Sequence, residues 1–408
     1  MTSSFFTFMS AAILACCQLS FNVNADSISD FNASWQGQAL ASQRLLDVYS
    51  PIIDNNILGT HNSYNSESYT SCNFSVGCRY LDPQQKHNLH EQLLMGARFI
   101  ELDVHWTAKM ESLFSYPKRL LLCHGFCSLN DKYFTEGLNE IKNWLNSADS
   151  EDQVIILYIE DHMEGHHTDA FNQINERFGQ WIYQSQGCQS IPDSLTKADV
   201  IAAGKKVILW GDGGCSNEIN WKNTAYTGLG NVGRIWEDRT TNKAIADIFT
   251  GGSDNYITDS DVTDFFQQGA NIVNLDDMVV RDNRLASGIW SWDVNEPNNV
   301  GDSQHCALQW SNGRWDDQFC GNDYAYACYD SQNKLWQVTD NTGSWDGGEQ
   351  ACQALGSQFH FDVPTNSFDN EKLKAAKEAK SHAQVWLDYS DQITEGEWRI
   401  NGLNPNEL

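Results

Sequence analysis

Short β-rich apolar runs alternate with amphipathic stretches along the first two thirds of the chain. Between the runs, apolar residues recur at the three- and four-residue spacing of a helix. Strand and helix in repeated alternation predict a parallel sheet, and uninterrupted apolar runs at 154–159 and 207–210 are typical of strands buried on both faces. The expected strands are 57–61, 97–104, 120–125, 153–161, 206–211, 233–236 and 271–275, and the expected helices are 90–95, 135–146, 168–183 and 259–268.

The number of these units decides between two kinds of α/β fold. Seven or eight of them in roughly 230 residues favour a closed, TIM-like (β/α) barrel over an open doubly wound sheet. The absence of a Gly-rich nucleotide-binding loop from the sequence agrees with this choice. We therefore expect an α/β fold in which residues 26–286 form a barrel.

The pattern changes after Arg284. Trp, Asn, Asp and Gly become frequent, long apolar runs disappear, and one helix is expected over residues 368–383. Four cysteines fall in this part of the chain, at positions 306, 320, 328 and 352. We predict that residues 287–408 form a second, small, disulfide-stapled α+β domain.

The N-terminal segment differs from both parts. Residues 1–25 contain no charged side chain, carry two apolar runs and end in Val23-Asn24-Ala25, a pattern typical of a secretory signal peptide. A buried first helix and a lipid anchor at Cys16 are the alternatives. We expect an exported, extracellular protein.

The amino-acid composition limits the kinds of partner that the protein can bind. The sequence has 54 acidic and 26 basic residues, a formal net charge of −28, and no long basic run, which excludes nucleic-acid binding through a cationic face. Hydrophobic content of 41% with only 20% charged residues indicates a globular chain rather than an acidic tail. A strongly anionic protein is repelled by anionic membranes at low salt, so we expect it to act on surfaces of low charge, at high ionic strength or with divalent cations.

The cysteines indicate disulfides. Twelve are present and ten remain beyond residue 25, an even number that suits an oxidising compartment. Short separations along the chain favour the pairs Cys72–Cys78, Cys123–Cys127 and Cys188–Cys215.

Polar residues stand at the ends of the early strands. Glu101 and Asp103 lie two apart within the second strand, and Glu160 ends the fourth. Residues two apart on a strand project to the same side, and in an α/β barrel the carboxyl ends of all strands open on one face. Together with Asn62 after the first strand, these residues form an oxygen ligand set that suits Ca²⁺.

Two histidines accompany the predicted ligands. His61 follows the first strand and His124 follows the third. Two separate imidazoles suit a general base and a general acid on opposite sides of a phosphorus atom. Asp276 and Asp277, after the last strand, either reach the site or cap a loop.

Four segments carry a family resemblance. ILGTHNSY (57–64), GARFIELDV (96–104), CHG (123–125) and VIILYIEDH (154–162) resemble, in order and spacing, the catalytic X region of phosphatidylinositol-specific phospholipase C enzymes. The resemblance covers roughly residues 50–280 and implies a distorted TIM-like barrel. It implies that His61 deprotonates the inositol 2-hydroxyl, that His124 protonates the departing diacylglycerol, and that the product is a cyclic inositol phosphate.

The resemblance also bears on cofactor and substrate. Metal-independent bacterial members place an Arg where this chain has Asp103, whereas calcium-dependent members have the acidic pattern seen here, so we expect Ca²⁺ dependence. Where the animal enzymes have Lys-Gly-Lys, this chain has Trp210-Gly211-Asp212. That departure favours phosphatidylinositol, its glycan-linked form or another head group over a polyphosphorylated lipid.

The C-terminal part resembles a C-type lectin-like domain whose two halves occur in reversed order. Glu296-Pro297-Asn298 and the residues up to Cys328 look like the second half, and residues 345–398 look like the first. A circular permutation would pair Cys306 with Cys320 and Cys328 with Cys352; two fused half-modules are the alternative. Glu296 and Asn298 resemble the sugar-binding calcium motif, whereas Gln304 and Asp316 depart from it, so a scaffold without sugar binding stays open.

The prediction for the whole chain is a secreted, calcium-dependent phosphatidylinositol-specific phospholipase C that meets its phospholipid at a membrane surface. The first alternative is a glycerophosphodiester phosphodiesterase, which also uses a barrel, a Glu-x-Asp pair and two histidines. Those enzymes usually have His-Arg at the first strand, and Asn62 speaks against them. The second alternative is an inactive barrel that serves as a lectin-like adhesin, with a glycan as its partner.

Overall fold

The computed structural model describes residues 28–73, 77–213, 216–227, 233–239 and 255–400. The predicted signal peptide lies outside these ranges. Within them, no helix has the length and apolar character needed to cross a bilayer.

An eight-stranded sheet forms the core of the N-terminal domain. Its hydrogen-bonded order is β7-β8-β6-β4-β1-β10-β9, all parallel, and β5 pairs with β4 in antiparallel fashion. The strands are β1 (Ile57–Thr60), β4 (Phe99–Ala108), β5 (Lys118–Leu122), β6 (Ile155–His162), β7 (Ile182–Tyr183), β8 (Val207–Gly211), β9 (Arg234–Trp236) and β10 (Ile272–Leu275). A separate small hairpin consists of β2 (Ser71–Asn73) and β3 (Gly77–Arg79).

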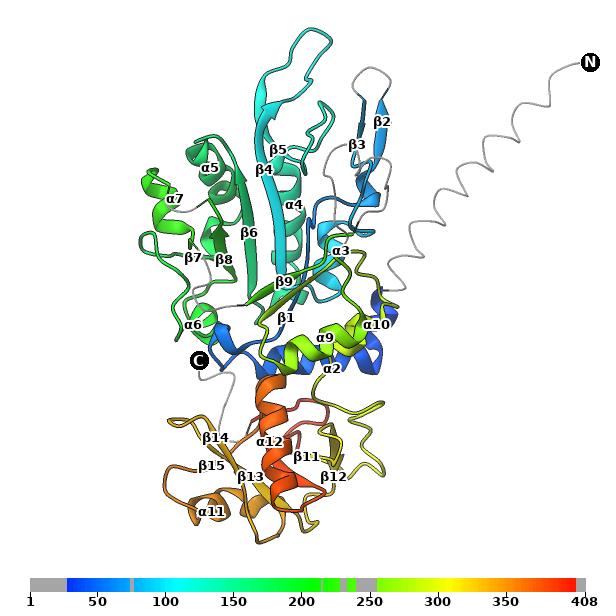
Figure 1. Cartoon of the computed structure of the whole chain (residues 1–408), viewed down its shortest axis with the longest axis vertical. Coiled ribbons are helices and arrows are strands. Elements are labelled where there is room, and N and C mark those ends of the chain that lie inside the picture. Colours follow the sequence, from blue (N-terminus) through cyan, green and yellow to red (C-terminus); the bar gives the residue numbers. More distant parts are fainter. Residues whose placement is uncertain (1–27, 74–76, 214–215, 228–232, 240–254, 401–408) are drawn as a thin grey trace, which may run out of the picture.

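Helices cover the outer face of this sheet. They are α2 (Trp35–Leu46), α3 (Leu89–Leu94), α4 (Phe134–Leu145), α5 (His167–Phe178), α6 (Lys197–Ala202), α7 (Ile219–Thr224), α9 (Asp259–Gln267) and α10 (Asn283–Ser287). Figure 1 shows the sheet curled, with helices on its outside. The α/β fold and the TIM-like strand arrangement are therefore confirmed, as a curled half-barrel. In the described part of the chain, no ladder joins β9 to β7 to close the ring.

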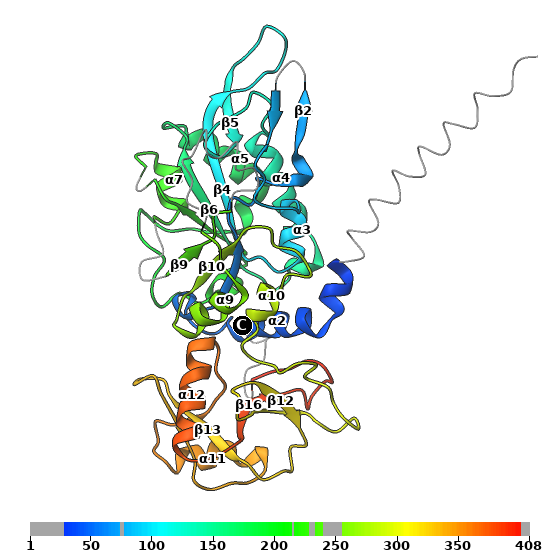
Figure 2. The same cartoon turned by 45° about the vertical axis from the view of Figure 1, so that its right-hand side comes forward.

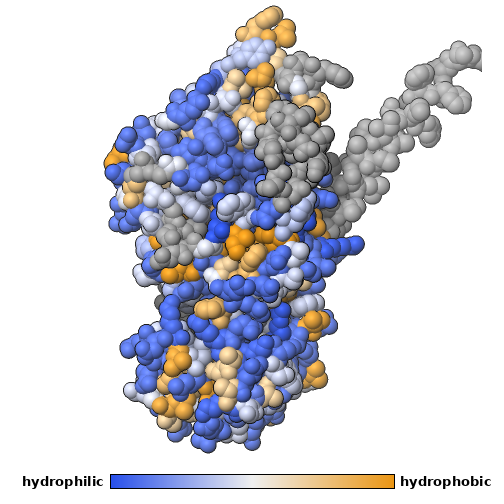
Figure 3. Space-filling view, viewed as in Figure 1, coloured by the Kyte–Doolittle hydropathy of each residue, from blue (hydrophilic) through white to orange (hydrophobic). Residues whose placement is uncertain are grey.

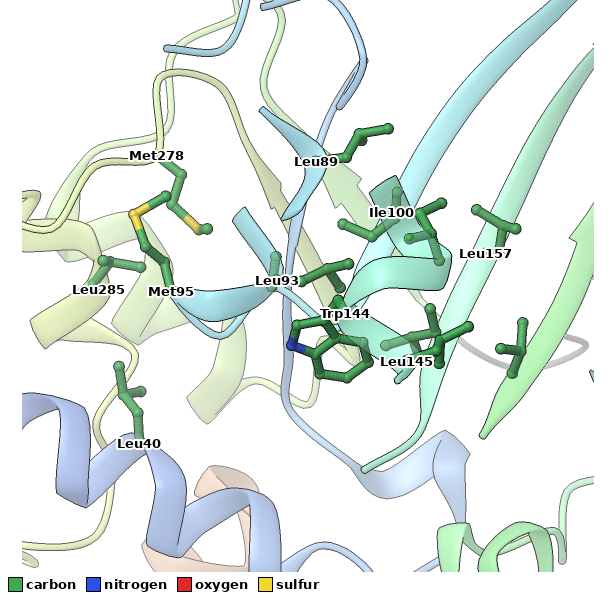
Figure 4. Packing of buried hydrophobic residues seen from close by; sticks show 14 of the residues in the cluster. Leu40, Leu89, Leu93, Met95, Ile100, Trp144, Leu145, Leu157, Met278 and Leu285 are labelled. Atoms are coloured by element: carbon green, nitrogen blue, oxygen red, sulfur yellow. The ribbon is translucent and has the colours of Figure 1, made fainter. Parts of the chain in front are cut away.

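Alternation along β4 sorts its side chains between the two faces. Ile100 points outward and packs with Leu93, Trp144 and Leu157, which Figure 4 shows closing the space between the sheet and the helices α3 and α4. Phe99 belongs to the inner cluster. Because side chains alternate, the acids at positions 101 and 103 share the inner face with Phe99, as the two-residue spacing predicts.

One predicted strand of the barrel was wrong, and one helix was not predicted. The stretch 120–125 was expected to be a parallel strand at a barrel position, but it is the antiparallel return strand of a hairpin, with Val104 opposite Leu122. An apolar run favours burial without specifying strand direction, and only nine residues, 109–117, connect β4 to β5, too few for a helical crossover. Helix α2 was not expected at all.

The C-terminal domain is a mixed α+β module. Its strands β11 (Cys306–Gln309), β12 (Trp315–Gln318), β13 (Ala325–Asp330), β14 (Leu335–Val338), β15 (His360–Phe361) and β16 (Val385–Ser390) form one sheet in the order β12-β11-β16-β13-β14, with β15 beside β13. Its helices are α11 (Gly348–Gln353) and α12 (Ser367–Ala379). The disulfides Cys306–Cys320 and Cys328–Cys352 are both present, as the resemblance implied.

The module packs on α2 at the amino ends of the barrel strands. Gln43 of α2 is buried, donates to the Gly288 carbonyl at 3.1 Å, and accepts from the backbone N–H groups of Trp290 and Ser291 at 2.8 and 3.1 Å. Both views show the module below α2 and α9, with the carboxyl ends of the barrel strands pointing the opposite way (Figures 1 and 2). The module therefore leaves the face where the predicted site lies uncovered.

Candidate active site

The register of three neighbouring strands brings the predicted site residues together. β1 aligns Thr60 with Ile100, and β6 aligns Glu160 with Asp103. These pairings place the ends of β1, β4 and β6 side by side at the carboxyl edge of the sheet.

The turn after β1 is built to hold a side chain over this edge. At Gly59, a Cβ atom would lie 2.7 Å from the Phe99 carbonyl oxygen, so only glycine allows β1 to approach β4 this closely. Asn62 has φ 43°, in the left-handed region that Asn tolerates better than most residues. Ser63 then ties the turn to β4, because its Oγ accepts from the Glu101 N–H at 2.8 Å.

His61 is buried and backed by a carboxylate. Its side-chain Nδ1 lies 3.1 Å from Oδ1 of Asp276, which follows β10 and is fully buried. Burial lowers the pKa of His61, but the hydrogen bond to Asp276 and the nearby charge of Glu101 outweigh it and raise the pKa to about 9. These charges favour the protonated ring, and Asp276 fixes its orientation.

His124 lies beside His61 and is also backed by a carboxylate. Its ring centroid is 6.5 Å from that of His61, and its Nδ1 lies 3.0 Å from Oδ2 of Asp103. Burial lowers the pKa of His124, while the hydrogen bond and charge of Asp103 raise it above its usual range. The residue sits in a loop closed by the disulfide Cys123–Cys127, and its side chain is 37% exposed.

Three carboxylates converge beside the histidines. One oxygen each from Glu101, Asp103 and Glu160 lies within 4.8 Å of the others. The amide of Asn62 lies 3.0 Å from both carboxylate oxygens of Asp103. The four predicted ligands therefore share one place in the structure.

The donor set fits a hard divalent cation. Burial and the neighbouring charges of Glu160 and Glu101 raise the pKa of Asp103, because three anions cannot lie so close together without cost. Carboxylate and amide oxygens are the ligands that Ca²⁺ prefers. A cation would neutralise Glu101 and Asp103, two of the carboxylates that raise the pKa of His61, and so make its proton easier to remove.

A cation of the chain itself also reaches the cluster. Arg234 of β9 pairs with Glu101 and lies over the rings of Tyr158 and Trp236, with its Cζ 4.6 and 5.2 Å from their centroids. The side chain of Trp236 is 48% exposed. Sequence reasoning missed Arg234, because a lone Arg on a short strand has no distinguishing local pattern.

Two further outcomes concern predicted residues. Asp276 reaches the site, whereas Asp277 turns away to Arg239, with 3.6 Å between carboxylate and guanidinium. Gln84, which the sequence did not single out, accepts from the Asn62 amide at 2.7 Å and donates to Asp238 at 3.1 Å.

Two of the three disulfides predicted from short separations are present in the structure, Cys72–Cys78 and Cys123–Cys127. Cys215, the expected partner of Cys188, lies outside the described residues.

A curled parallel half-barrel with two carboxylate-backed histidines facing an acidic cluster defines a phosphodiesterase-type enzyme of the phospholipase C kind. Comparison with known proteins agrees: the family model described as the Rv2075c PI-PLC-like domain matches residues 17–228, just over half of the chain. The chain belongs to this family.

The chain is also similar to one curated relative and to two solved structures. It is 26% identical over 404 residues to the uncharacterized protein Rv2075c of Mycobacterium tuberculosis H37Rv, covering 87% of this chain and 80% of that protein. It is similar to the phosphatidylinositol-specific phospholipase C of Listeria monocytogenes (13% identity, 59% of this chain, 95% of that one, TM-score 0.38). It is also similar to a calcium-dependent phosphoinositol-specific phospholipase C from a Pseudomonas species (13% identity, 59% of this chain, 92% of that one, TM-score 0.34).

Proposed function

We propose that this chain is an exported, calcium-dependent phosphatidylinositol-specific phospholipase C, which cleaves its lipid to diacylglycerol and a cyclic inositol phosphate. The observation that carries the proposal is the pair of neighbouring histidines, His61 and His124, beside three converging carboxylates. Family membership supports the phosphodiester chemistry, and the resemblance to phosphatidylinositol-specific enzymes implies attack by a hydroxyl of the substrate itself.

His61 would act as the base. In its neutral form, with Nδ1–H donating to Asp276, the ring would take the proton from the inositol 2-hydroxyl at Nε2. The oxygen then attacks phosphorus, and the bond from phosphorus to the glycerol oxygen breaks. His124, whose Nδ1 is held by Asp103, would give its proton to that leaving oxygen.

The acidic cluster would hold the cation. The ligands would be Asn62, Glu101, Asp103 and Glu160, each through an oxygen. When bound, Ca²⁺ lowers the pKa of a coordinated hydroxyl and stabilises negative charge that develops at phosphorus. Glu160 is also held by His162, whose Nε2 lies 2.7 Å from its Oε1.

Two features favour a head group without extra phosphates. At the end of β8, where cations would be needed, Asp212 accepts from the Tyr158 hydroxyl at 2.9 Å and from the Asp161 N–H at 2.8 Å. At the end of β9, the exposed ring of Trp236 offers a flat apolar surface beside Arg234. A neutral inositol ring suits such a surface better than a polyphosphate does.

The test is an assay of the full exported chain on phosphatidylinositol, with Ca²⁺ or with a chelator, for wild type and His61→Ala. We expect a cyclic inositol phosphate that requires both the metal and His61. Activity with chelator present would overturn the calcium assignment. Cleavage of glycerophosphodiesters without lipid hydrolysis would favour the glycerophosphodiesterase alternative.

For the C-terminal module we propose a C-type lectin-like scaffold with its halves in reversed order, supported by the two disulfide pairs. Glu296, Asp316 and Asp317 converge there, and Oε2 of Glu296 is buried without a hydrogen-bond partner among the described residues. Burial and the charge of Asp316 raise the pKa of Glu296 to about 8. Binding on a glycan array that is lost in Glu296→Ala would support sugar recognition; binding that survives would leave only the scaffold.

A further inference from the structure

The hairpin of β4 and β5 extends past the barrel sheet. β4 pairs with β6 only as far as His105, whereas its ladder with β5 continues to Ala108 opposite Lys118. The ribbon then continues through a backbone hydrogen bond of 2.9 Å from Lys109 to Pro117. Figures 1 and 2 show it as the part of the barrel domain farthest from the C-terminal module.

The turn at the end of this hairpin is apolar. The Ser115 N–H donates to the Ser112 carbonyl at 3.1 Å, so Leu113 and Phe114 occupy the two central positions. They are 62% and 90% exposed, and Tyr116 beside them is 47% exposed. Turns in water favour Gly, Asn, Asp or Pro at such positions, and nothing in the turn geometry requires two large apolar side chains. Figure 3 shows the resulting hydrophobic patch at the top of the molecule.

The charges around the turn are paired. Lys118 forms an ion pair of 2.8 Å with Glu164, and Arg119 forms one of 2.9 Å with Glu111. The tip is therefore apolar and locally neutral on a chain whose net charge is −28. An anionic surface repels such a protein, whereas a zwitterionic lipid surface accepts the tip without a charge penalty.

We propose that Leu113, Phe114 and Tyr116 insert into a zwitterionic phospholipid surface and anchor the barrel domain there. The proposal rests on the proposed function for its link to catalysis, because the same hairpin leads directly from the tip to His124. The seven residue steps from Ser115 to Leu122 span roughly 23 Å when extended. The hairpin must therefore lie obliquely on the lipid surface for a head group to reach His124. Phe126, which is 70% exposed and close to that histidine in the sequence, would approach the lipid in the same orientation.

The test compares vesicle binding of the full chain with that of the variant Leu113→Ser/Phe114→Ser, by sedimentation with phosphatidylcholine vesicles. We expect the double variant to lose on the order of tenfold or more in partitioning, because two large apolar side chains no longer leave water. Phe114→Leu keeps an apolar side chain and should retain most binding. The matched control is Phe319→Ser/Ile393→Ser, which removes two exposed apolar residues of the C-terminal module, 56% and 81% exposed, and should bind as wild type does.

Added anionic phospholipid should weaken wild-type binding at low salt. Equal binding by wild type and the tip variant, or no binding by wild type, would overturn the proposal. A dimer that dissociates in the tip variant, without vesicle binding, would assign the tip to a second copy of the chain instead.

Phosphatidylcholine lacks inositol, so vesicle binding does not depend on the proposed reaction. A parallel assay on a water-soluble inositol phosphodiester should give equal rates for the tip variant and wild type. If neither protein cleaves it while the binding difference persists, the proposed function fails and the anchor stands.

Discussion

The two histidines of the site are held in opposite ways. His61 is 7% exposed, follows a central strand of the sheet and is backed by Asp276, which directly follows the neighbouring strand β10. His124 is more than a third exposed, follows an antiparallel return strand and is backed by Asp103, a member of the acidic cluster. The comparison indicates that the base is positioned by the fold as a whole, and the acid by a local loop and by the cluster.

The largest expected effect separates the two roles. His61→Ala should lower kcat by roughly 10³-fold with any leaving group, because the variant lacks the proposed base for the hydroxyl proton. His124→Ala should lower kcat similarly with a lipid, but much less with a nitrophenyl ester of inositol phosphate, since nitrophenolate leaves without a proton.

Measuring kcat on both substrates for both variants checks these roles. His360→Ala, an exposed histidine of the C-terminal module, is the control and should behave as wild type. Equal losses on the nitrophenyl substrate for His61→Ala and His124→Ala would contradict the assignment of acid and base.

The second prediction concerns Ca²⁺ at the acidic cluster of Glu101, Asp103 and Glu160. A chelator should lower kcat by at least about 10²-fold, and Ca²⁺ should restore it, because charge at phosphorus loses its stabilisation. Glu160→Gln should raise the Ca²⁺ concentration needed for half-maximal activity. If the chelator has no effect, Arg234, which already pairs with Glu101, becomes the cation that serves the reaction.

The sequence predicts the surroundings of His61 better than those of His124. The half around His61 depends on buried parallel strands, and their continuous apolar runs mark them, so β1, β4 and β6 lie where expected. The two-residue spacing of Glu101 and Asp103 likewise predicts their shared face. The half around His124 depends on strand direction, which an apolar run does not encode, so β5 was misassigned although His124 still reaches the site.

Contacts between distant segments were the least predictable. Asp276 lies 215 residues after His61, and its carboxylate differs from that of its neighbour Asp277 only in where the turn points it. Arg234 and Gln84 enter the site from loops and a short strand with no local signature. Only the tertiary structure determines which of these polar residues face the centre.

The next prediction tests the hydrogen bond between His61 and Asp276. Asp276→Asn should lower kcat by about 10²-fold with little change in KM, because an amide can hold the wrong tautomer of the imidazole. Asp277→Asn is the matched control and should be nearly neutral, since this carboxylate faces Arg239. A pH titration of His61 by NMR should show a lower pKa in Asp276→Asn than in wild type, whose hydrogen bond to Asp276 favours the protonated ring. An unchanged titration would mean that Asp276 supports only the fold.

The smallest effect tests the loop that holds His124. Cys123→Ser/Cys127→Ser should lower kcat about tenfold on the lipid while KM stays constant, because the proton donor is no longer held against the leaving oxygen. The matched control is Cys72→Ser/Cys78→Ser, which opens a loop of similar length in the β2–β3 hairpin. Both changes should cost roughly 2 kcal/mol of unfolding free energy by loop entropy, so stability alone does not separate them. The nitrophenyl substrate does: if the disulfide serves the acid, its loss should leave that rate unchanged. A lower kcat on both substrates would mean that the disulfide Cys123–Cys127 supports the whole site. The inference that the fold as a whole positions the base, whereas a local loop positions the acid, would then be wrong.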